Sequence, residues 1–354
     1  WRMALVVVIL STQQQQQRTN NCCMAFVIPK MTSSFHSKSL SSSSSCLYSA
    51  GADLGLLTFD LDDTLFPVGP VVMDANQGMA KEIHLILGID DNDNDKMEST
   101  IAGVVQGMRD ARAKATATKQ PLSYSEQRKQ GIRQQMELMV PASSPPMDQA
   151  TVDRVFDAWL TERNHAAERR IFPGALEALE TIVTNYPNAC IAAVTNGRGN
   201  PLDMTKTLRP YFRFCISGED DAVFPNRKPH AGIYEASLDA YYSKHQSSDE
   251  TDATWIHVGD CLANDVGGSA KCGAKTIWYD AGGEENNENS AAARAKSGAK
   301  PVWSTAPPAE MKKRAALAEE GRKLVSARVT SLLELPDAIS DILSATTTTT
   351  TTTT

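Results

Sequence analysis

A short apolar run that stops abruptly at carboxylates is the feature that most restricts how this chain can fold. Residues 56–59 read Leu-Leu-Thr-Phe, and Asp-Leu-Asp-Asp-Thr follows at once. Such a run is typical of a strand that is buried on both faces of a parallel sheet and ends at a polar site. Similar runs occur later in the chain, at residues 189–194, 212–216, 254–258 and 275–278.

Helix-forming segments separate these runs, for example residues 174–183 and 232–242. Strands that alternate with helices favour an α/β fold with a doubly wound, Rossmann-like parallel sheet. In such sheets, ligands bind beyond the carboxyl ends of the strands, at the point where the order of winding reverses. We therefore expect the acids that follow the first run to mark a ligand site.

A long segment with little strand character lies between the first two apolar runs. Its sequence predicts a helical domain inserted after the first strand, with helices near residues 74–87, 96–117, 125–139 and 149–164. The acidic stretch at residues 90–95 superficially resembles a calcium-binding loop. Lys96 and Ala102 stand where such a loop needs Gly and Glu, so we expect a solvated helix–helix loop there instead.

Both ends of the chain have unusual composition. Residues 1–52 contain no Asp or Glu and are rich in Ser and Gln, which predicts a disordered targeting leader (a transit peptide) for an organelle. The alternative is a disordered low-complexity segment without a targeting signal, in a cytoplasmic protein. Residues 345–354 are mostly Thr and predict a disordered tail. Residues 281–327 predict a polar, helix-prone second insertion.

Charge and cysteine usage exclude several classes of protein. The chain has 35 Lys+Arg against 42 Asp+Glu, a formal net charge of −7, which argues against a nucleic-acid partner. No apolar run reaches the roughly 18 residues of a membrane span. The 7 cysteines are odd in number and form no Cys-x-x-Cys pattern, so a disulfide framework or zinc site is not expected. The sequence leaves both a monomer and a homodimer open.

The acids directly after the first apolar run form the first candidate site. Two carboxylates two residues apart, just beyond a strand, can point into one pocket. Asp60 would be a nucleophile, because carboxylates can form aspartyl-phosphates. Asp62 would protonate the leaving oxygen and then deprotonate the attacking water. The alternative is an Asx-rich turn, which is common after strands.

Three further motifs follow later apolar runs. Thr195 and Asn196 offer a hydroxyl and backbone N–H groups that suit phosphate oxygens. Lys228, before a proline at an expected helix start, can place a cation near the phosphate. Asp260 and Asp265 suit a metal that prefers oxygen ligands, such as Mg²⁺. The alternatives are an ordinary turn, a surface lysine and a helix-capping acid.

The four motifs together resemble the haloacid dehalogenase-like (HAD) hydrolase superfamily, over residues 54–280 and 328–343. The helical insertion resembles the C1-capped branch. The resemblance implies a catalytic core at residues 53–66, 171–280 and 328–344, and a helical C1 cap at residues 67–170. Residues 328–344 would supply a last short strand and a closing helix.

The resemblance also implies roles for the motif residues. Asp60 would be the nucleophile and a Mg²⁺ ligand, and Asp62 the general acid/base with its main-chain carbonyl on the metal. Asp260 would bind Mg²⁺ directly, and Asp265 would bind or orient a metal-bound water. Lys228 would stabilise the transferring phosphoryl group, which Thr195 and Asn196 would hold.

An acid at position 62 favours a phosphate ester as substrate, because a halide leaving group needs no proton. Residues 194–197, 211–214, 227–229 and 257–268 resemble a bacterial-type phosphatase of riboflavin metabolism, which acts on FMN and on 5-amino-6-(5-phosphoribitylamino)uracil phosphate. We therefore expect a Mg²⁺-dependent phosphatase for a small phosphorylated metabolite. A plastid would suit that pathway. A nucleotide or sugar phosphatase, a sugar phosphomutase and a non-catalytic HAD scaffold are the alternatives.

The cap carries side chains that could contact a substrate, namely Arg128, Arg133, Trp159 and Arg163. The spacing of Trp159 among apolar neighbours predicts packing in the cap core instead. Charge on a helix face is usually solvated, so we expect the three arginines to lie at the surface.

Overall fold

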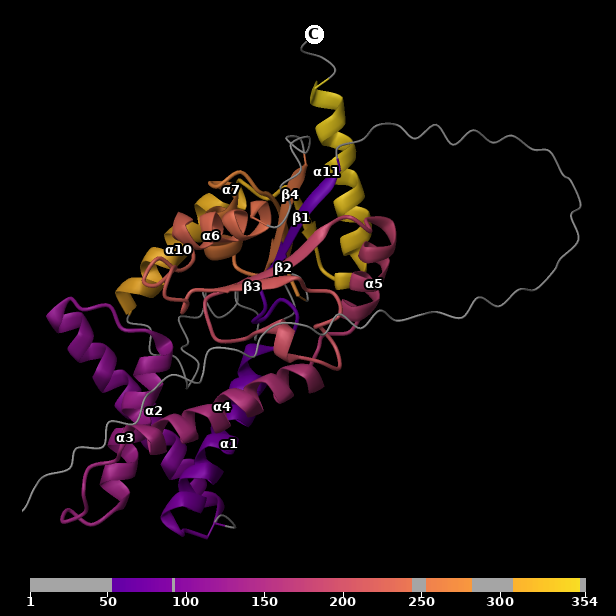
Figure 1. Ribbon diagram of the computed structural model, residues 1–354. Helices are drawn as coiled ribbons and strands as arrows, with labels where there is room; N and C mark the ends of the chain where they lie inside the picture. Colours follow the sequence, from indigo (N-terminus) through magenta and orange to yellow (C-terminus); the bar gives the residue numbers. More distant parts are fainter. Residues whose placement is uncertain (1–52, 91–92, 244–252, 282–307, 351–354) are drawn as a thin grey trace, which may run out of the picture. The chain divides into compact units, whose positions relative to one another are not determined.

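The computed structural model describes residues 53–90, 93–243, 253–281 and 308–350 (Figure 1). The expected leader at residues 1–52 and most of the second insertion lie outside the described residues. Within the described part, no helix is long and apolar enough to cross a membrane.

A six-stranded sheet, parallel throughout, forms the centre of the core, in the order β3-β2-β1-β4-β5-β6. This arrangement confirms the predicted α/β, doubly wound fold. The chain winds outward from β1 on one side and then crosses to β4 on the other, so the order of winding reverses beside β1. The strands are β1 (Leu54–Phe59), β2 (Cys190–Thr195), β3 (Phe214–Ser217), β4 (Thr254–Gly259), β5 (Lys275–Tyr279) and β6 (Ala327–Val329).

Helices cover both faces of the sheet, which explains why its strands are apolar almost throughout. On one face, β1 side chains such as Leu57 pack with α5 (Ala175–Asn185) and α11 (Leu335–Thr350). On the other face, Leu56 packs with α6 (Ala231–Tyr242). Figure 1 shows α5 and α11 on the opposite side of the strands from α6, α7 (Gly267–Ala270) and α10 (Pro308–Arg322).

Four helices lie between β1 and α5 and have a hydrophobic core of their own, which includes Met79, Ile132 and Trp159. We call residues 67–170 the cap. Its helices begin at capping side chains where the sequence offers them: Ser123 accepts a hydrogen bond from the N–H of Glu126, and Asp148 from that of Thr151. The helices are α1 (Val68–Leu87), α2 (Asn94–Thr118), α3 (Tyr124–Met139) and α4 (Gln149–Arg169).

The acidic stretch before α2 contains a helix cap. The Asp93 carboxylate accepts hydrogen bonds from the backbone N–H groups of Asp95 and Lys96, at the start of α2. This agrees with the expected helix–helix loop, of which residues 91–92 lie outside the description.

The threonine-rich end differs from our expectation. We predicted disorder from residue 345, but α11 continues to Thr350. The helix is anchored earlier by the buried side chains of Ile339 and Ile342, and adding residues to an existing helix costs much less than starting one. Thr346 also donates its hydroxyl to the Ile342 carbonyl, so the prediction of a tail disordered from residue 345 is wrong for the described turns.

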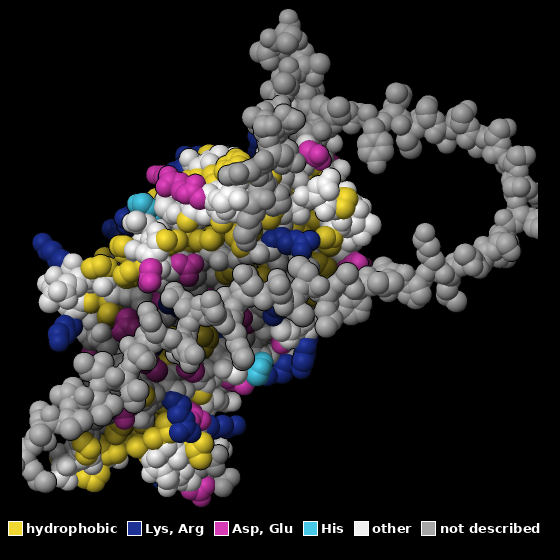
Figure 2. All heavy atoms as spheres, in the orientation of Figure 1, with side chains coloured by type: hydrophobic (Ala, Val, Ile, Leu, Met, Phe, Trp, Pro, Cys, Tyr) yellow, Lys and Arg dark blue, Asp and Glu magenta, His cyan; other side chains and the backbone are white. Residues whose placement is uncertain are grey.

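The surface of the described part mixes charges of both signs. Figure 2 shows Lys and Arg side chains interspersed with Asp and Glu on the face that it draws. The described cysteines, Cys190, Cys215, Cys261 and Cys272, are all free thiols.

Candidate active site

The predicted site residues meet at the carboxyl ends of three adjacent strands. Asp60 follows β1, Thr195 ends β2, and Asp260 follows β4. Because these strands are parallel neighbours, their carboxyl ends share one edge of the sheet. The backbone N–H of Asp60 still donates to the Val258 carbonyl, so the first acid is held in register with β4.

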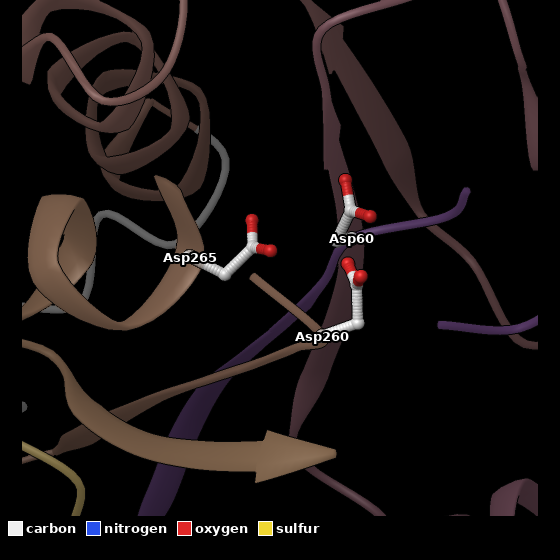
Figure 3. A group of neighbouring side chains, drawn as sticks. All are labelled: Asp60, Asp260 and Asp265. Atoms are coloured by element: carbon white, nitrogen blue, oxygen red, sulfur yellow. The ribbon is translucent and has the colours of Figure 1, made fainter. Parts of the chain in front are cut away.

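Three carboxylates converge at this edge (Figure 3). Asp60, Asp260 and Asp265 each place one oxygen so that all three oxygens lie within 4.8 Å of one another. Asp265 reaches the cluster from the short helix η2 (Leu262–Val266), where its Oδ2 accepts from the Cys261 N–H at 2.9 Å. Gly259 allows this approach, because a Cβ there would lie 2.4 Å from the Asp265 Cβ.

Lys228 binds two of these acids. Its Nζ lies 2.8 Å from Asp60 Oδ1 and 2.7 Å from Asp265 Oδ1, and its side chain is 1% exposed. Asn196 fixes the lysine backbone: its Oδ1 accepts from the Lys228 N–H at 2.8 Å, and its amide donates to the Lys228 carbonyl. The Asn196 side chain therefore positions Lys228, and its own predicted contact with phosphate stays a prediction.

Two threonine hydroxyls form hydrogen bonds at the ends of these strands. Thr64 Oγ1 donates to Asp60 Oδ2 and accepts from the Asp260 N–H at 3.1 Å, so it links the first and fourth motifs. Thr195 is 1% exposed, and its Oγ1 accepts from the Gly197 N–H at 3.3 Å. This bond shapes the turn that we predicted to hold phosphate.

Burial and charge repulsion shift the protonation of the cluster. Burial raises the pKa of Asp60 to about 7, against the attraction of Lys228 and with the help of the Asp265 charge. Burial and then Asp265 place the pKa of Asp260 well above its ordinary range. Burial also acts to raise the pKa of Asp265, but Lys228 and His257 outweigh it and lower that pKa.

The raised pKa values of Asp60 and Asp260 show that one lysine supplies too little positive charge for three clustered acids. The donor set consists of carboxylate oxygens, which hard divalent cations such as Mg²⁺ prefer. The residues therefore fit a divalent cation, which Asp60, Asp260 and Asp265 would hold. The Asp62 side chain is not part of this cluster, and a metal contact through its main-chain carbonyl stays a prediction.

Asp62 is instead paired with the cap. Its Oδ1 lies 2.6 Å from Arg163 Nη2 of α4. The loop after β2 wraps closely around this guanidinium, because a Cβ on Gly199 would lie 2.5 Å from Arg163 Nη1. Arg163 and Arg128 are buried, so our expectation that they form a solvated face is wrong for these two, whereas Arg133 is partly exposed. Trp159 packs in the cap core as predicted.

A second contact joins cap and core through a residue that the sequence did not single out. Glu219, in the loop after β3, accepts hydrogen bonds from the backbone N–H groups of Tyr124 and Ser125, both at 2.9 Å. These N–H groups lie in the first turn of α3, where a carboxylate is favoured by the helix dipole. Glu219 is an acid shortly after an apolar run, and this position could have marked it as a candidate. Nothing in the nearby sequence indicates that it binds the start of α3.

The described end of the second insertion packs against η2, the short helix that carries Asp265. Helix α10 packs against η2, and Gly321 makes this contact so close that a Cβ there would lie 1.9 Å from the Leu262 carbonyl oxygen. Arg314 of α10 lowers the pKa of Asp260 and so opposes its rise. Glu310 of the same helix pairs with Arg112 of the cap.

Known proteins share this fold. Residues 225–302 match the family model described as HAD-hydrolase-like. No curated protein matches the sequence. A 2-haloacid dehalogenase from Pseudomonas syringae pv. Tomato DC3000 is similar in structure, with a TM-score of 0.50 and 20% identity over 81% of this chain and 99% of that chain.

Two further solved structures are more distant. A HAD phosphatase from Thermococcus onnurineus gives a TM-score of 0.40 at 15% identity, over 81% of this chain and 98% of that one. An L-2-haloacid dehalogenase from Xanthobacter autotrophicus gives 0.43 at 16% identity, with the same coverage of 81% and 98%. The matching segment is similar to HAD-like hydrolases in sequence, and the sheet and its helices are similar to a 2-haloacid dehalogenase in fold.

Proposed function

We propose that this protein is a Mg²⁺-dependent phosphatase that hydrolyses a small-molecule phosphate monoester through an aspartyl-phosphate on Asp60. The observation that carries the proposal is the buried Asp60 carboxylate, held by Lys228 at 2.8 Å within a cluster of acids at a strand end. A second acid, Asp62, follows two residues later and pairs with Arg163 of the cap.

In the first half-reaction, a carboxylate oxygen of Asp60 attacks phosphorus and the P–O bond to the leaving alcohol breaks. Asp62 gives its proton to the departing oxygen, so the alcohol leaves neutral. In the second half-reaction, Asp62 takes a proton from the attacking water, the acyl-phosphate P–O bond breaks, and Asp60 and inorganic phosphate are released.

Charge neutralisation is the main demand of this chemistry, because an anionic nucleophile approaches an anionic phosphate. Lys228 supplies one positive charge between Asp60 and Asp265. A Mg²⁺ ion held by the acids would supply Lewis-acid neutralisation of the phosphoryl oxygens. Thr195 and the N–H groups after it would hold the phosphoryl group.

Asp62 separates this reaction from dehalogenation, the activity named for two of the similar structures. Hydrolysis of a carbon–halogen bond releases a halide, which needs no proton. A phosphate ester releases an alcohol, which does. The position of Asp62 beside Asp60 therefore favours phosphate esters. A sugar phosphomutase would use the same acids, but would return the phosphoryl group to a sugar.

The test is a screen of phosphate esters with Mg²⁺, including FMN, the ribitylaminouracil phosphate, nucleotides and sugar phosphates, with 2-chloropropionate as the dehalogenase substrate. We expect phosphate release from at least one ester, and its loss by more than a thousandfold in Asp60→Asn. Asp53→Asn, the same change at an exposed acid before β1, is the matched control. Chloride release without phosphate release, or full activity in Asp60→Asn, would refute the proposal.

A further inference from the structure

Two arginines of the cap are buried near each other beside the proposed site. Arg163 of α4 is 2% exposed, and Arg128 of α3 is 7% exposed. Within the described residues, Asp62 is the one acid that forms an ion pair with either of them. Arg163 Nη1 is buried and has no hydrogen-bond partner, which is costly for a charged donor.

Neutral groups hold Arg128 in one orientation. Its Nη1 donates to Asn76 Oδ1 at 3.0 Å, and its guanidinium carbon lies 3.9 Å from the centroid of the Trp159 ring. Asn76 Oδ1 also accepts from the Trp159 indole N–H at 3.1 Å. Asn76 therefore fixes both the guanidinium of Arg128 and the ring on which it stacks. A guanidinium stacked in this way keeps its remaining N–H edge available for an anion.

The two cations also influence each other. Burial, and then the charge of Arg163, lowers the pKa of Arg128 to about 9. Asp62 pairs with Arg163 alone, so the two buried positive charges face one carboxylate between them, and a bound anion would supply the missing negative charge.

Arg163 connects the pair to the reacting end of the site. A Cβ on Gly197 would lie 3.6 Å from Asp62 Oδ2 and 4.0 Å from Arg163 Nη2. Gly197 follows Thr195 and Asn196, which we propose to hold the phosphoryl group. The arginines therefore extend from that loop into the cap, where the rest of a bound substrate would lie.

We propose that Arg128 and Arg163 bind a second anionic group of the substrate, so that the protein prefers phosphate monoesters that also carry a carboxylate or a second phosphate. The inference rests on the proposed phosphatase function and names the substrate class for it. It predicts that FMN, whose ring carries no second anionic group, is a poor substrate.

Matched pairs of esters test the inference by their kcat/KM ratios. One pair is 3-phosphoglycerate and glycerol 3-phosphate, and the other is fructose 1,6-bisphosphate and fructose 6-phosphate. We expect at least a tenfold preference for the doubly anionic member of at least one pair, and the pair that shows it identifies carboxylate or phosphate as the group. A preference below threefold in both pairs would overturn the inference while leaving the phosphatase function intact.

Variants assign the preference to the arginines. Arg128→Gln should reduce the ratio to below threefold, and Arg128→Lys should keep part of it because the charge remains. Arg133→Gln, at a partly exposed position of the same helix whose guanidinium donates to Gln149, should keep the full ratio. Thermal unfolding identifies variants that do not fold, and an unchanged ratio in folded Arg128→Gln would also overturn the inference.

Binding separates the two proposals if no ester is hydrolysed. Calorimetric titration of the unmodified protein with the same four compounds needs no turnover. Binding at least tenfold tighter for the doubly anionic members would support the arginine site while the phosphatase function fails. Equal or undetectable binding without turnover would count against both.

Discussion

Glu219→Gln tests whether a single core carboxylate holds the cap in place. Glu219 is 4% exposed, and its two oxygens accept one backbone N–H each from the first turn of α3, from Tyr124 and Ser125. Arg227 Nη1 lies 3.8 Å from Oε1. Glutamine has the same shape but offers only one acceptor oxygen and no charge.

The expected loss in the free energy of unfolding follows from these contacts. One N–H loses a charged acceptor, at about 1.5–3 kcal/mol. The lost negative charge at the helix N-terminus adds about 0.3–1 kcal/mol. We therefore expect Glu219→Gln to lower the free energy of unfolding by about 2–4 kcal/mol, and the amide hydrogens at the start of α3 to exchange faster than those of β1.

Urea denaturation measures the free energy, and hydrogen exchange with mass spectrometry measures the local opening. Glu126→Gln is the matched control, because Glu126 lies in the same turn but is exposed, and its effect should stay below about 0.5 kcal/mol. A loss below 0.5 kcal/mol in Glu219→Gln, with unchanged exchange in α3, would refute the reasoning.

The cluster of Asp60, Asp260 and Asp265 and the residues that support it give three further predictions. The folded-state pKa of Asp60, about 7, lies above its ordinary value of 3.8, so the stability linked to this group is present at low pH and is lost as pH rises through 7. Mg²⁺ would bind the ionised form of Asp60. Adding Mg²⁺ should therefore raise the Tm of the protein more at pH 8 than at pH 5.5. Equal increases at both pH values would contradict a metal site at this cluster. Lys228→Met should cost about 3–5 kcal/mol without metal, and less at pH 5, where Asp60 can take up a proton; urea denaturation at both pH values checks this. Gly321→Ala should destabilise by about 1–3 kcal/mol through its clash with the Leu262 carbonyl, although Ala favours helices. Ala316→Gly, at an exposed position of the same helix, should cost only about 1 kcal/mol, and a stabilised Gly321→Ala would show that α10 does not pack closely on η2.

The parallel sheet and the acids at its edge could be predicted from the sequence, because both depend on local pattern. An apolar run such as residues 56–59 must be covered on both faces, and only a parallel sheet between helices does this readily. The side chains that follow such strands then meet at one edge without further information. This is why Asp60 and Asp260 could be placed together from the strand pattern, whereas Lys228, which lies before a helix, was added by the motif that the resemblance supplied.

The partners of the cap side chains depend on the tertiary structure. Arg163 and Asp62 are separated by 101 positions, and Glu219 and Ser125 by 94. Nothing near either residue indicates that the cap lies over the core in a particular orientation. The sequence of a helix predicts that its arginines are solvated unless the surface that covers them is known. Arg128 and Arg163 were therefore predicted to lie at the surface. The local sequence pattern thus determined where the strands lie and which acids follow them. The docking of two separately packed bodies decided which charges are buried, because burial is a property of surfaces that meet only in the folded chain.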